Sequence, residues 1–542
     1  DAGPLDRARA RAVLARVLAA RAGDDPAAAL AAAARELEAA AQEAPGDAGV
    51  RVALARGERA RGAPVKAPAA LGPRAATPAD AARDPLVADA AARALAAQGR
   101  ALDAITLVDA ALSLAPNDAT LLVTKGLVLA ASGKAADAEK LFSDAAARDL
   151  RAWEPHLALG ARRLVRGELD DAEREMKLAV ERAPREGEAH AGLADVRLAR
   201  GDLAGAEEAY RRALAVDPAS ASARLGTARV ALARGDAAQA RTAVEAALRL
   251  DARLAGAQLL LGELAWKARD LPAAQKAFAE AVAADARDGR ARGKLGAVEL
   301  EAGLADAALK DLLTASNMEA DSAEIRAWLG RALLAKGDTP LAVEQLRRAA
   351  ALDPRSAAYA RELGGALERS NAPAEALEAY RDAVARAPDA VEGYEALAGA
   401  LAGQDRCPEA IAELEKAIAR APREPRLRVA VADCDVRLGR HAAAAALYRR
   451  ALDADPRQVQ LLYKIARAQH EAGGLRAALP WYERAAREDP KDALSHYHLG
   501  FAYKDRGDRK RAVAAFASYL RLKPDAEDRK DIEREIEDLG GM

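Results

Sequence analysis

Few of the residues and motifs that carry enzyme chemistry are present in this 542-residue chain. It has two cysteines, six histidines and only 3% aromatic residues. It contains no glycine-rich phosphate loop, no His-Glu-x-x-His, no Cys-x-x-Cys and no Gly-x-Ser-x-Gly. These absences remove the usual nucleotide, zinc and serine-hydrolase sites. We therefore predict that the chain is not an enzyme and uses no cofactor and no metal.

Charge of one sign and long apolar runs are also missing. The 82 Lys and Arg nearly balance the 83 Asp and Glu, giving a net charge of −1. The two signs are interspersed, so no field favours nucleic acid or an anionic membrane. Arg or Glu interrupts every apolar stretch well before the roughly 18 residues that a membrane span requires. We expect no nucleic-acid partner and no transmembrane segment.

What is present is a repeat of 34 residues, found thirteen times from Pro85 to Ala526 without insertion or deletion. Position 20 of every unit is Ala, position 8 is Gly or Ala, and position 24 is large and apolar or aromatic. A period of this length is typical of a stacked array, in which each unit buries its apolar face against its neighbours.

Each unit has the pattern of two antiparallel helices. Apolar residues recur every three or four positions over two stretches of about fourteen residues. The first stretch often ends on Gly near position 15, as at Gly133 and Gly507, and Pro stands at position 32 in nine units. We expect the small residues at 8 and 20 to meet where helices A and B cross. Position 24, with the small position 27, should seat helix B on the next helix A. The predicted fold class is an all-α superhelical solenoid.

These motif positions resemble the tetratricopeptide repeat family. The best-matching unit is Ala493–Ala526, which departs from the pattern at position 27, where Tyr519 replaces the Ala of the other twelve units. Its matching residues are Leu499, Gly500, Tyr503, Ala512, Phe516 and Pro524. The resemblance implies the fold and says little about function, since such arrays serve many pathways.

The two ends are less regular, and we predict four regions. Residues 1–61 form an irregular helical subdomain, residues 62–84 a Pro-rich linker, residues 85–526 the thirteen repeats and residues 527–542 a capping helix. Within the first region we expect helices over Leu5–Ala22, Pro26–Glu43 and Ala48–Arg61. A loop packed along the array is the alternative to the linker. The cap places three apolar residues on one stripe: Ile532, Ile536 and Leu539.

The few cysteines and histidines do not indicate a metal or catalytic site. Cys407 and Cys434 fall at positions 17 and 10, where helix B of one unit faces helix A of the next. A disulfide between them is conceivable, and two buried thiols are the interpretation we favour. His496 and His498 lie two residues apart on a helix, do not face each other, and so cannot share a metal.

The surface is then the remaining candidate for function. In arrays of this family, helix A lines the concave side and exposes positions 2, 5, 6, 9, 12 and 13. In the middle units these positions are mostly small or charged, interrupted by Trp266 and Trp328. The last two units carry aromatic and basic residues instead: Tyr463, Lys464, Arg467, His470, Tyr497, His498 and Phe501. We predict a protein-binding site there, with Lys464 and Arg467 as rim charges. The alternative is that the rings fill space near the cap.

The expected partner is a folded domain or a helix. Chaperone-binding members of the family hold a C-terminal carboxylate with Asn and Lys at positions 5, 6 and 9, where only Lys464 fits. The three asparagines, Asn117, Asn317 and Asn371, lie off the concave face, so no ladder of side-chain amides is available either. Recognition should depend on shape, apolar contact and charge.

Origin and compartment are suggested only indirectly. The sequence begins at Asp1 rather than Met, as a processed exported protein or a trimmed chain would. The abundance of Ala and Arg is typical of a GC-rich genome. We expect a scaffold of a bacterial envelope assembly, in the periplasm or cell envelope, serving secretion, pilus, motility or polysaccharide export. The alternatives are a cytoplasmic regulatory scaffold and the targeting arm of a larger enzyme.

Overall fold

The computed structural model describes residues 26–44, 47, 54 and 81–540. The chain divides into two compact units, Asp1–Ala302 and Gly303–Met542, with the boundary inside the seventh repeat. The helices expected over Leu5–Ala22 and Ala48–Arg61, and residues 62–80 of the Pro-rich segment, lie outside the described residues or nearly so.

The described residues are helical, joined by short turns, and contain no strand. The helices of the first unit are α2 (Pro26–Glu43), α6 (Pro85–Ala97), α7 (Ala101–Leu114), α8 (Ala119–Ala131), α9 (Ala135–Arg148), α10 (Glu154–Val165), α11 (Leu169–Arg182), α12 (Gly187–Ala199), α13 (Leu203–Val216), α14 (Ala221–Ala233), α15 (Ala237–Leu250), α16 (Ala255–Lys267), α17 (Leu271–Ala284) and α18 (Gly289–Glu301).

The helices of the second unit are α19 (Ala305–Met318), α20 (Ala323–Lys336), α21 (Thr339–Leu352), α22 (Ala357–Arg369), α23 (Pro373–Arg386), α24 (Val391–Gly403), α25 (Cys407–Arg420), α26 (Pro425–Arg437), α27 (His441–Ala454), α28 (Gln460–Gly473), α29 (Leu475–Glu488), α30 (Ala493–Asp505), α31 (Arg509–Leu522) and α32 (Arg529–Asp538).

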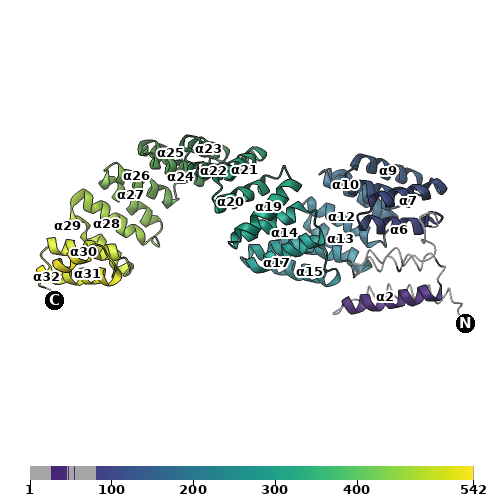
Figure 1. The fold of residues 1–542 in the computed structure, drawn as a ribbon, viewed down its shortest axis with the longest axis horizontal. Coiled ribbons are helices and arrows are strands. Elements are labelled where there is room, and N and C mark those ends of the chain that lie inside the picture. Colours follow the sequence, from purple (N-terminus) through teal and green to yellow (C-terminus); the bar gives the residue numbers. More distant parts are fainter. Residues whose placement is uncertain (1–25, 45–46, 48–53, 55–80, 541–542) are drawn as a thin grey trace. The chain divides into compact units, whose positions relative to one another are not determined.

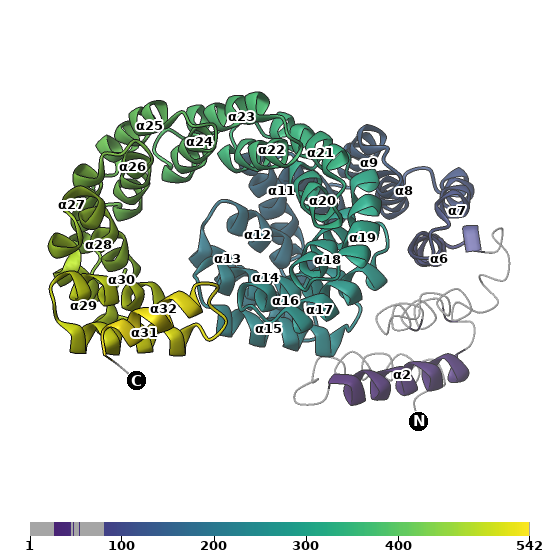
Figure 2. The same cartoon turned by 60° about the vertical axis from the view of Figure 1, so that its left-hand side comes forward.

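Consecutive helices pair and stack in sequence order within each unit (Figure 1). The even-numbered helices α6 to α30 are helix A of their repeats. Each odd-numbered helix from α7 to α31 is a helix B of 14 residues. The prediction of an all-α solenoid of helix pairs is confirmed. In the second unit, α22, α24, α26, α28 and α30 lie on the inner side of the curve that the helices follow (Figure 2).

Side-chain caps start the helices at two fixed positions of the repeat. At position 34, before helix A, the capping carboxylates and hydroxyls are those of Asp84, Asp118, Ser220, Asp288, Ser322, Ser356 and Asp492. At position 16, before helix B, they are those of Asp202, Asp236, Asp270, Asp338 and Asp508. Each accepts a hydrogen bond from a backbone N–H of the first turn, which would otherwise lack a partner in the helix.

In twelve of the repeats the turn between helices A and B has a left-handed residue at position 15. In nine repeats this residue is Gly, with φ between 72° and 83°. Arg269, Asn371 and Asp405 take the same conformation without being glycine, with φ of 63°, 58° and 58°. The twelfth repeat is different, because α28 extends to Gly473 and the positive φ of 81° falls on Gly474. The unbroken phase of the repeat thus reflects one turn geometry used again and again.

Packing within a repeat depends on position 24. A Cβ added to Gly126 would lie 2.4 Å from the ring of Phe142, and one added to Gly500 would lie 2.3 Å from Phe516. The large residue at 24 therefore lies directly on position 8 of its own helix A. It also reaches the next helix A, because a Cβ on Gly226 at position 6 would meet Tyr210 at 2.1 Å. The expectation for position 24 covered only this second contact.

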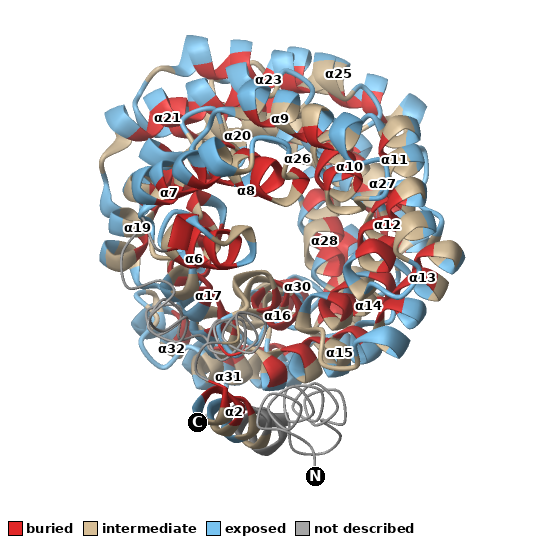
Figure 3. Ribbon diagram, turned by 90° about the vertical axis from the view of Figure 1, so that its right-hand side faces the viewer, coloured by how far each residue is buried: buried red, intermediate tan, exposed pale blue. Residues whose placement is uncertain are grey.

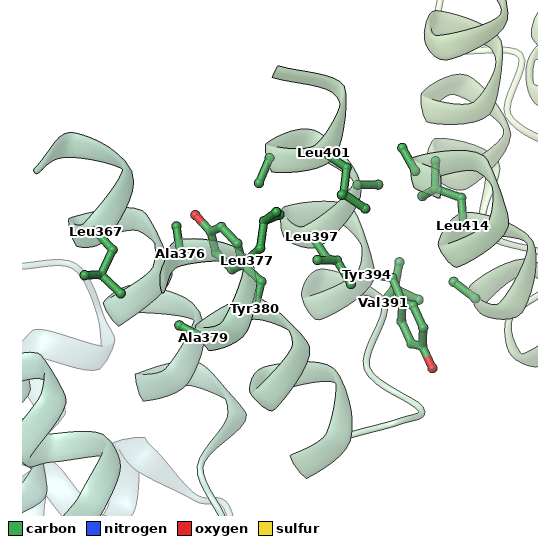
Figure 4. Close-up of a cluster of buried hydrophobic side chains, with 14 of the residues drawn as sticks. Leu367, Ala376, Leu377, Ala379, Tyr380, Val391, Tyr394, Leu397, Leu401 and Leu414 are labelled. Atoms are coloured by element: carbon green, nitrogen blue, oxygen red, sulfur yellow. The ribbon is translucent and has the colours of Figure 1, made fainter. Parts of the chain in front are cut away.

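One continuous stretch of this packing runs from α20 to α26, and Figure 4 shows its part between Leu367 and Leu414. Tyr380 on α23 and Tyr394 on α24 are both buried within it. Buried residues lie where helices face one another, and exposed residues lie along the outer helices and turns (Figure 3).

The two ends of the described chain differ from the repeats. At the N-terminal end, α2 has the bounds expected for it and contacts α15. At the C-terminal end, α32 begins at Arg529 and packs Ile532, which is buried, with Ile536 and Leu539 against Phe516 and the last repeat. The final helix pair therefore does not leave its apolar face open to water.

Candidate protein-binding surface

The residues predicted to bind a partner lie on α28 and α30, the helices A of the last two repeats. Tyr463 and Tyr497 occupy position 5 of these helices, His498 position 6 and Phe501 position 9. All four side chains are half-buried, so each offers part of its ring to the surface. We call these four residues the aromatic row.

The aromatic row is continuous. The Tyr463 ring lies 5.9 Å from His498, His498 lies 5.2 Å from Tyr497, and Tyr497 lies 5.0 Å from Phe501, measured between ring centroids. These rings on α28 and α30 thus form one connected set. His498 is the ring that connects the two tyrosines.

A second layer of rings supports the row from helix B. His498 stacks on Tyr482 with centroids 5.1 Å apart and planes 17° apart, and Phe501 meets Phe516 edge-on at 5.0 Å. Tyr482 and Phe516 are fully buried. The row therefore rests on packed rings, which lowers the entropy cost of using it as a docking surface.

Tyr519, the residue that breaks the family pattern at position 27, is part of this support. Its ring lies 5.1 Å from Tyr497, and its hydroxyl donates to Asp528, 2.7 Å away, just before α32. Burial and Asp528 raise the pKa of Tyr519 to about 12. The side chain therefore joins the aromatic row to the C-terminal cap, so space-filling near the cap and surface binding are not exclusive alternatives.

The two predicted rim cations differ from each other. Lys464 Nζ lies 2.7 Å from Asp433 Oδ1 and 5.4 Å from the centre of the Tyr448 ring, so its charge is engaged within the chain. Lys464 therefore offers less charge to a partner than an unpaired lysine would, and its role at the rim stays a prediction. Arg467 is exposed, and its charge opposes the rise in the pKa of Tyr463 that burial causes.

Burial dominates the electrostatics of the row. It lowers the pKa of His498 to about 4, helped by His470 and Arg467, so the imidazole is neutral at physiological pH. Burial also raises the pKa of Tyr463 and of Tyr497. The row is therefore an uncharged aromatic surface with Arg467 at its edge.

The two tryptophans of the middle repeats have surroundings different from those of the row. Trp328 is only 8% exposed, so its ring is part of the packing rather than an open contact, which corrects its placement on the surface. Trp266 is half-buried and lines an open depression of about 640 Å³ with Glu263, Lys267, Arg269, Lys294 and Glu301. Its Nε1–H donates to Glu301, 3.0 Å away, and Lys294 lies over its ring at 5.9 Å.

Two residues of this region were not among the predicted site residues. They are Tyr482, at position 24 of the twelfth repeat, and Asp433, at position 9 of the eleventh. The signal that could have found them is a pairing between positions 9 and 24, since Tyr448 donates to Asp433 and Tyr210 to Asp195 in the same way.

Other chemistry is sparse in the described part of the chain. No group of three or more His, Cys, Asp or Glu side chains there could hold a metal ion. Nor does the described chain include a helix with the length and apolarity of a membrane span. Cys407 and Cys434 are free thiols, both buried. Burial and the neighbouring Cys407 raise the pKa of Cys434 to about 12, which leaves its thiol protonated and unreactive.

Comparison with known proteins agrees with the fold. The family model described as Tetratricopeptide repeat matches residues 90–155, 157–215, 192–255, 259–323, 329–391, 395–459 and 463–527. No curated protein sequence matches the chain.

Solved structures give distant similarities. The crystal structure of yeast Tom70 aligns with 15% identity and a TM-score of 0.37, over 72% of this chain and 95% of that one. The Cut9–Hcn1 structure of the APC/C aligns with 12% identity and a TM-score of 0.38, over 82% and 95%. The pilF protein of Pseudomonas aeruginosa aligns with 23% identity and a TM-score of 0.33, over 39% and 97%.

Proposed function

Because the chain belongs to the tetratricopeptide repeat family, we propose that it is a non-catalytic scaffold whose protein partner docks on the aromatic row. The family match over most of the chain supports a role in protein–protein interaction. The location of the docking site is supported by one observation: four half-buried rings on α28 and α30 contact one another in sequence and lie on a buried second layer of rings. Rigid aromatic side chains of this kind supply most of the binding energy in protein interfaces.

The row fits a folded domain or a helix better than an extended peptide. Rings on two adjacent inner helices form a patch that can accept apolar side chains projecting from one surface. Side-chain amides, which grip an extended main chain, are absent from the row. Arg467 at the edge favours an acidic neighbour on the partner and acts mainly on the rate of association and its salt dependence.

The test compares ring truncations in two parts of the array. The full chain serves as bait in the native organism, with crosslinking and mass spectrometry to identify a partner that is then purified. Tyr497→Ala and Phe501→Ala should each weaken the complex by at least about 2 kcal/mol, roughly 30-fold in Kd. Trp266→Ala is the matched control, since Trp266 is a half-buried ring of helix A far along the sequence. It should leave Kd within about threefold.

Helicity and hydrogen exchange of α32 are measured on each variant, because Tyr497 and Phe501 also pack near the cap. If folded Tyr497→Ala and Phe501→Ala proteins bind normally while Trp266→Ala abolishes binding, the docking site belongs to the sixth repeat. That result would refute the location.

We also propose a pathway in which the scaffold acts. We place it in a bacterial envelope assembly for secretion, pilus function, motility or polysaccharide export. The Ala- and Arg-rich composition, typical of a GC-rich genome, supports the bacterial origin, and the envelope is the part of the proposal that experiment must decide. Cell fractionation with an antibody against the chain tests this placement. Recovery with periplasmic or envelope markers is expected, and recovery with cytoplasmic markers would replace it by the cytoplasmic scaffold.

A further inference from the structure

The array carries four tyrosines at position 24, and one of them differs from the other three. Tyr210 donates its hydroxyl hydrogen to Asp195, Tyr380 to Glu368 and Tyr448 to Asp433. Each acceptor is a carboxylate on helix A of the same repeat, at position 9 or 12. Position 24 thus directs a buried ring towards helix A with its hydroxyl beside these two positions.

Tyr482 is the exception. Its side chain is fully buried, yet its hydroxyl has no hydrogen-bond partner among the described residues. In its repeat, position 9 is Arg467 and position 12 is His470, so neither offers a carboxylate. His470 Nδ1 is also buried and without a partner. Leaving a buried donor unpaired costs about as much as losing a hydrogen bond, so the pair calls for an explanation.

The rings around Tyr482 show where these atoms lie. His470 meets Tyr482 edge-on at 6.5 Å, and the His498 ring lies 5.8 Å from His470 and 5.1 Å from Tyr482. Tyr463 lies 6.1 Å from Tyr482. The two unpaired atoms thus belong to rings that lie directly beside the aromatic row.

Two carboxylates of the chain, Glu471 and Asp492, act on the pKa of Tyr482, but neither accepts a hydrogen bond from its hydroxyl. Asp492 accepts from the backbone N–H of Leu494, 3.2 Å away, and from the Ser495 hydroxyl, so it caps α30. Arg467 forms no ion pair with a carboxylate in the described residues. Three polar groups here thus have no hydrogen bond or ion pair to a carboxylate in the described part of the chain: the Tyr482 hydroxyl, His470 Nδ1 and the Arg467 guanidinium.

We propose that Tyr482, His470 and Arg467 bind one acidic side chain, an Asp or Glu, of the docked partner. The partner's carboxylate takes the place that Asp195, Glu368 and Asp433 occupy in the other repeats. Hydrogen bonds between a phenol or guanidinium and a carboxylate are charge-assisted and strong when water is excluded by surrounding rings. This inference rests on the proposed function, since it names the chemistry of the partner at the same surface.

The first arm of the test needs no partner and compares two tyrosines. Tyr448→Phe removes a hydroxyl that donates to Asp433, so it should lower the melting temperature. Tyr482→Phe removes a hydroxyl without an acceptor, so the melting temperature should stay the same or rise. An equal loss in both variants would show that Tyr482 already has a partner within the protein, and would overturn the inference.

The second arm uses capped amino acids as probes on the full chain labelled with 3-fluorotyrosine. The ten tyrosines give ten fluorine resonances, and the Tyr482→Phe spectrum identifies the one of interest. N-acetylglutamate amide should shift the Tyr482 resonance in a saturable way at millimolar concentration. N-acetylglutamine amide, at the same ionic strength, should not. Equal shifts with the two probes, or none with either, would contradict the proposal.

The third arm is a variant that gives the twelfth repeat the acidic residue found at position 9 of other repeats. Arg467→Asp supplies at position 9 the carboxylate that Tyr448 and Tyr210 already have. Arg467→Asp should raise the melting temperature and abolish the response to N-acetylglutamate amide. Arg467→Gln should also abolish the response but should not raise the melting temperature. If the probe binds as expected but Tyr497→Ala leaves partner binding intact, the docking proposal fails alone. If docking depends on Tyr497 but the probe is silent, the carboxylate inference fails alone.

Discussion

The sixth repeat and the last repeat are built on the same contact but present different surfaces. In the sixth, Phe278 lies on Gly262, where an added Cβ would approach its ring to 2.6 Å, and meets Trp266 edge-on at 6.0 Å. In the thirteenth, Phe516 lies on Gly500 in the same way and meets Phe501 edge-on at 5.0 Å. The core of a repeat is therefore common to both.

The surfaces differ because the outer neighbours differ. Around Trp266 they are polar: Glu301 accepts its N–H and Lys294 covers its ring. Around Phe501 they are further rings, Tyr497 and, next to it, Tyr519. In the sixth repeat, charged side chains thus surround the Trp266 ring. In the thirteenth repeat, the Phe501 ring is part of a patch of aromatic rings. The residues at positions 8 and 24 therefore form the packed core of a repeat, while those at positions 5, 6, 9 and 12 determine the chemistry of its surface.

The largest expected effect tests the shared core. Phe278→Ala and Phe516→Ala should each destabilise their own repeat by about 3–5 kcal/mol, because each leaves a cavity over a glycine. Hydrogen exchange of α16 with α17, and of α30 with α31, measures the local cost, since repeats of an array can open separately. Leu102→Ala, at a side chain that is 81% exposed, is the control and should change little. A much smaller loss for Phe516→Ala would show that the two cores are not equivalent.

The second prediction concerns acid, which should loosen the last repeats selectively. Folded His498 has a pKa of about 4, below its ordinary value of 6.5, because of burial with His470 and Arg467 nearby. Between these two values the unfolded chain binds the proton and the folded chain does not. Stability is therefore complete above about pH 6.5 and is lost as pH falls towards 4.

Hydrogen exchange of α30 between pH 7 and pH 4, corrected for intrinsic rates, measures this loss. His498→Phe keeps a ring on Tyr482 and removes the titration, so its acid sensitivity should be smaller than that of the unaltered protein. Asp492 and Glu471, which also act on His498, are unchanged in both proteins. An identical pH dependence for the two would contradict the assignment.

The smallest expected effect concerns the turn of the sixth repeat. Arg269→Gly should stabilise by up to about 1 kcal/mol, because Arg269 has φ of 63° and a left-handed residue with a Cβ is strained. The greater freedom of glycine in the unfolded chain offsets part of this gain. The ion pair with Glu301, 3.5 Å away and exposed, contributes little. Thermal melting should show a small rise.

Gly507→Ala is the reverse experiment in the last repeat. Its φ of 81° is left-handed and no atom lies within 4 Å of an added Cβ, so any loss of stability comes from the backbone alone. A fall in melting temperature is expected. A rise there, or a fall for Arg269→Gly, would mean that the turn tolerates a side chain in both repeats.

The sequence by itself determined the repeated architecture. A 34-residue period with Ala at position 20 and Gly or Ala at position 8 allows only closely packed helix pairs, because a larger side chain would separate the two backbones. The glycine turns and the positions of the rings at 5, 9 and 24 followed from the same numbering. These features are local, or repeat at fixed spacing, and can therefore be predicted without a structure.

Only the tertiary structure decided which side chains are open to a partner. Lys464 and Trp328 occupy positions that the repeat exposes, yet one is paired with Asp433 and the other is buried. The missing acceptor of Tyr482 likewise emerged only when its neighbours were in place. Exposure and pairing depend on contacts between residues far apart in the sequence, so helical periodicity fixes the direction of a side chain but not what it meets.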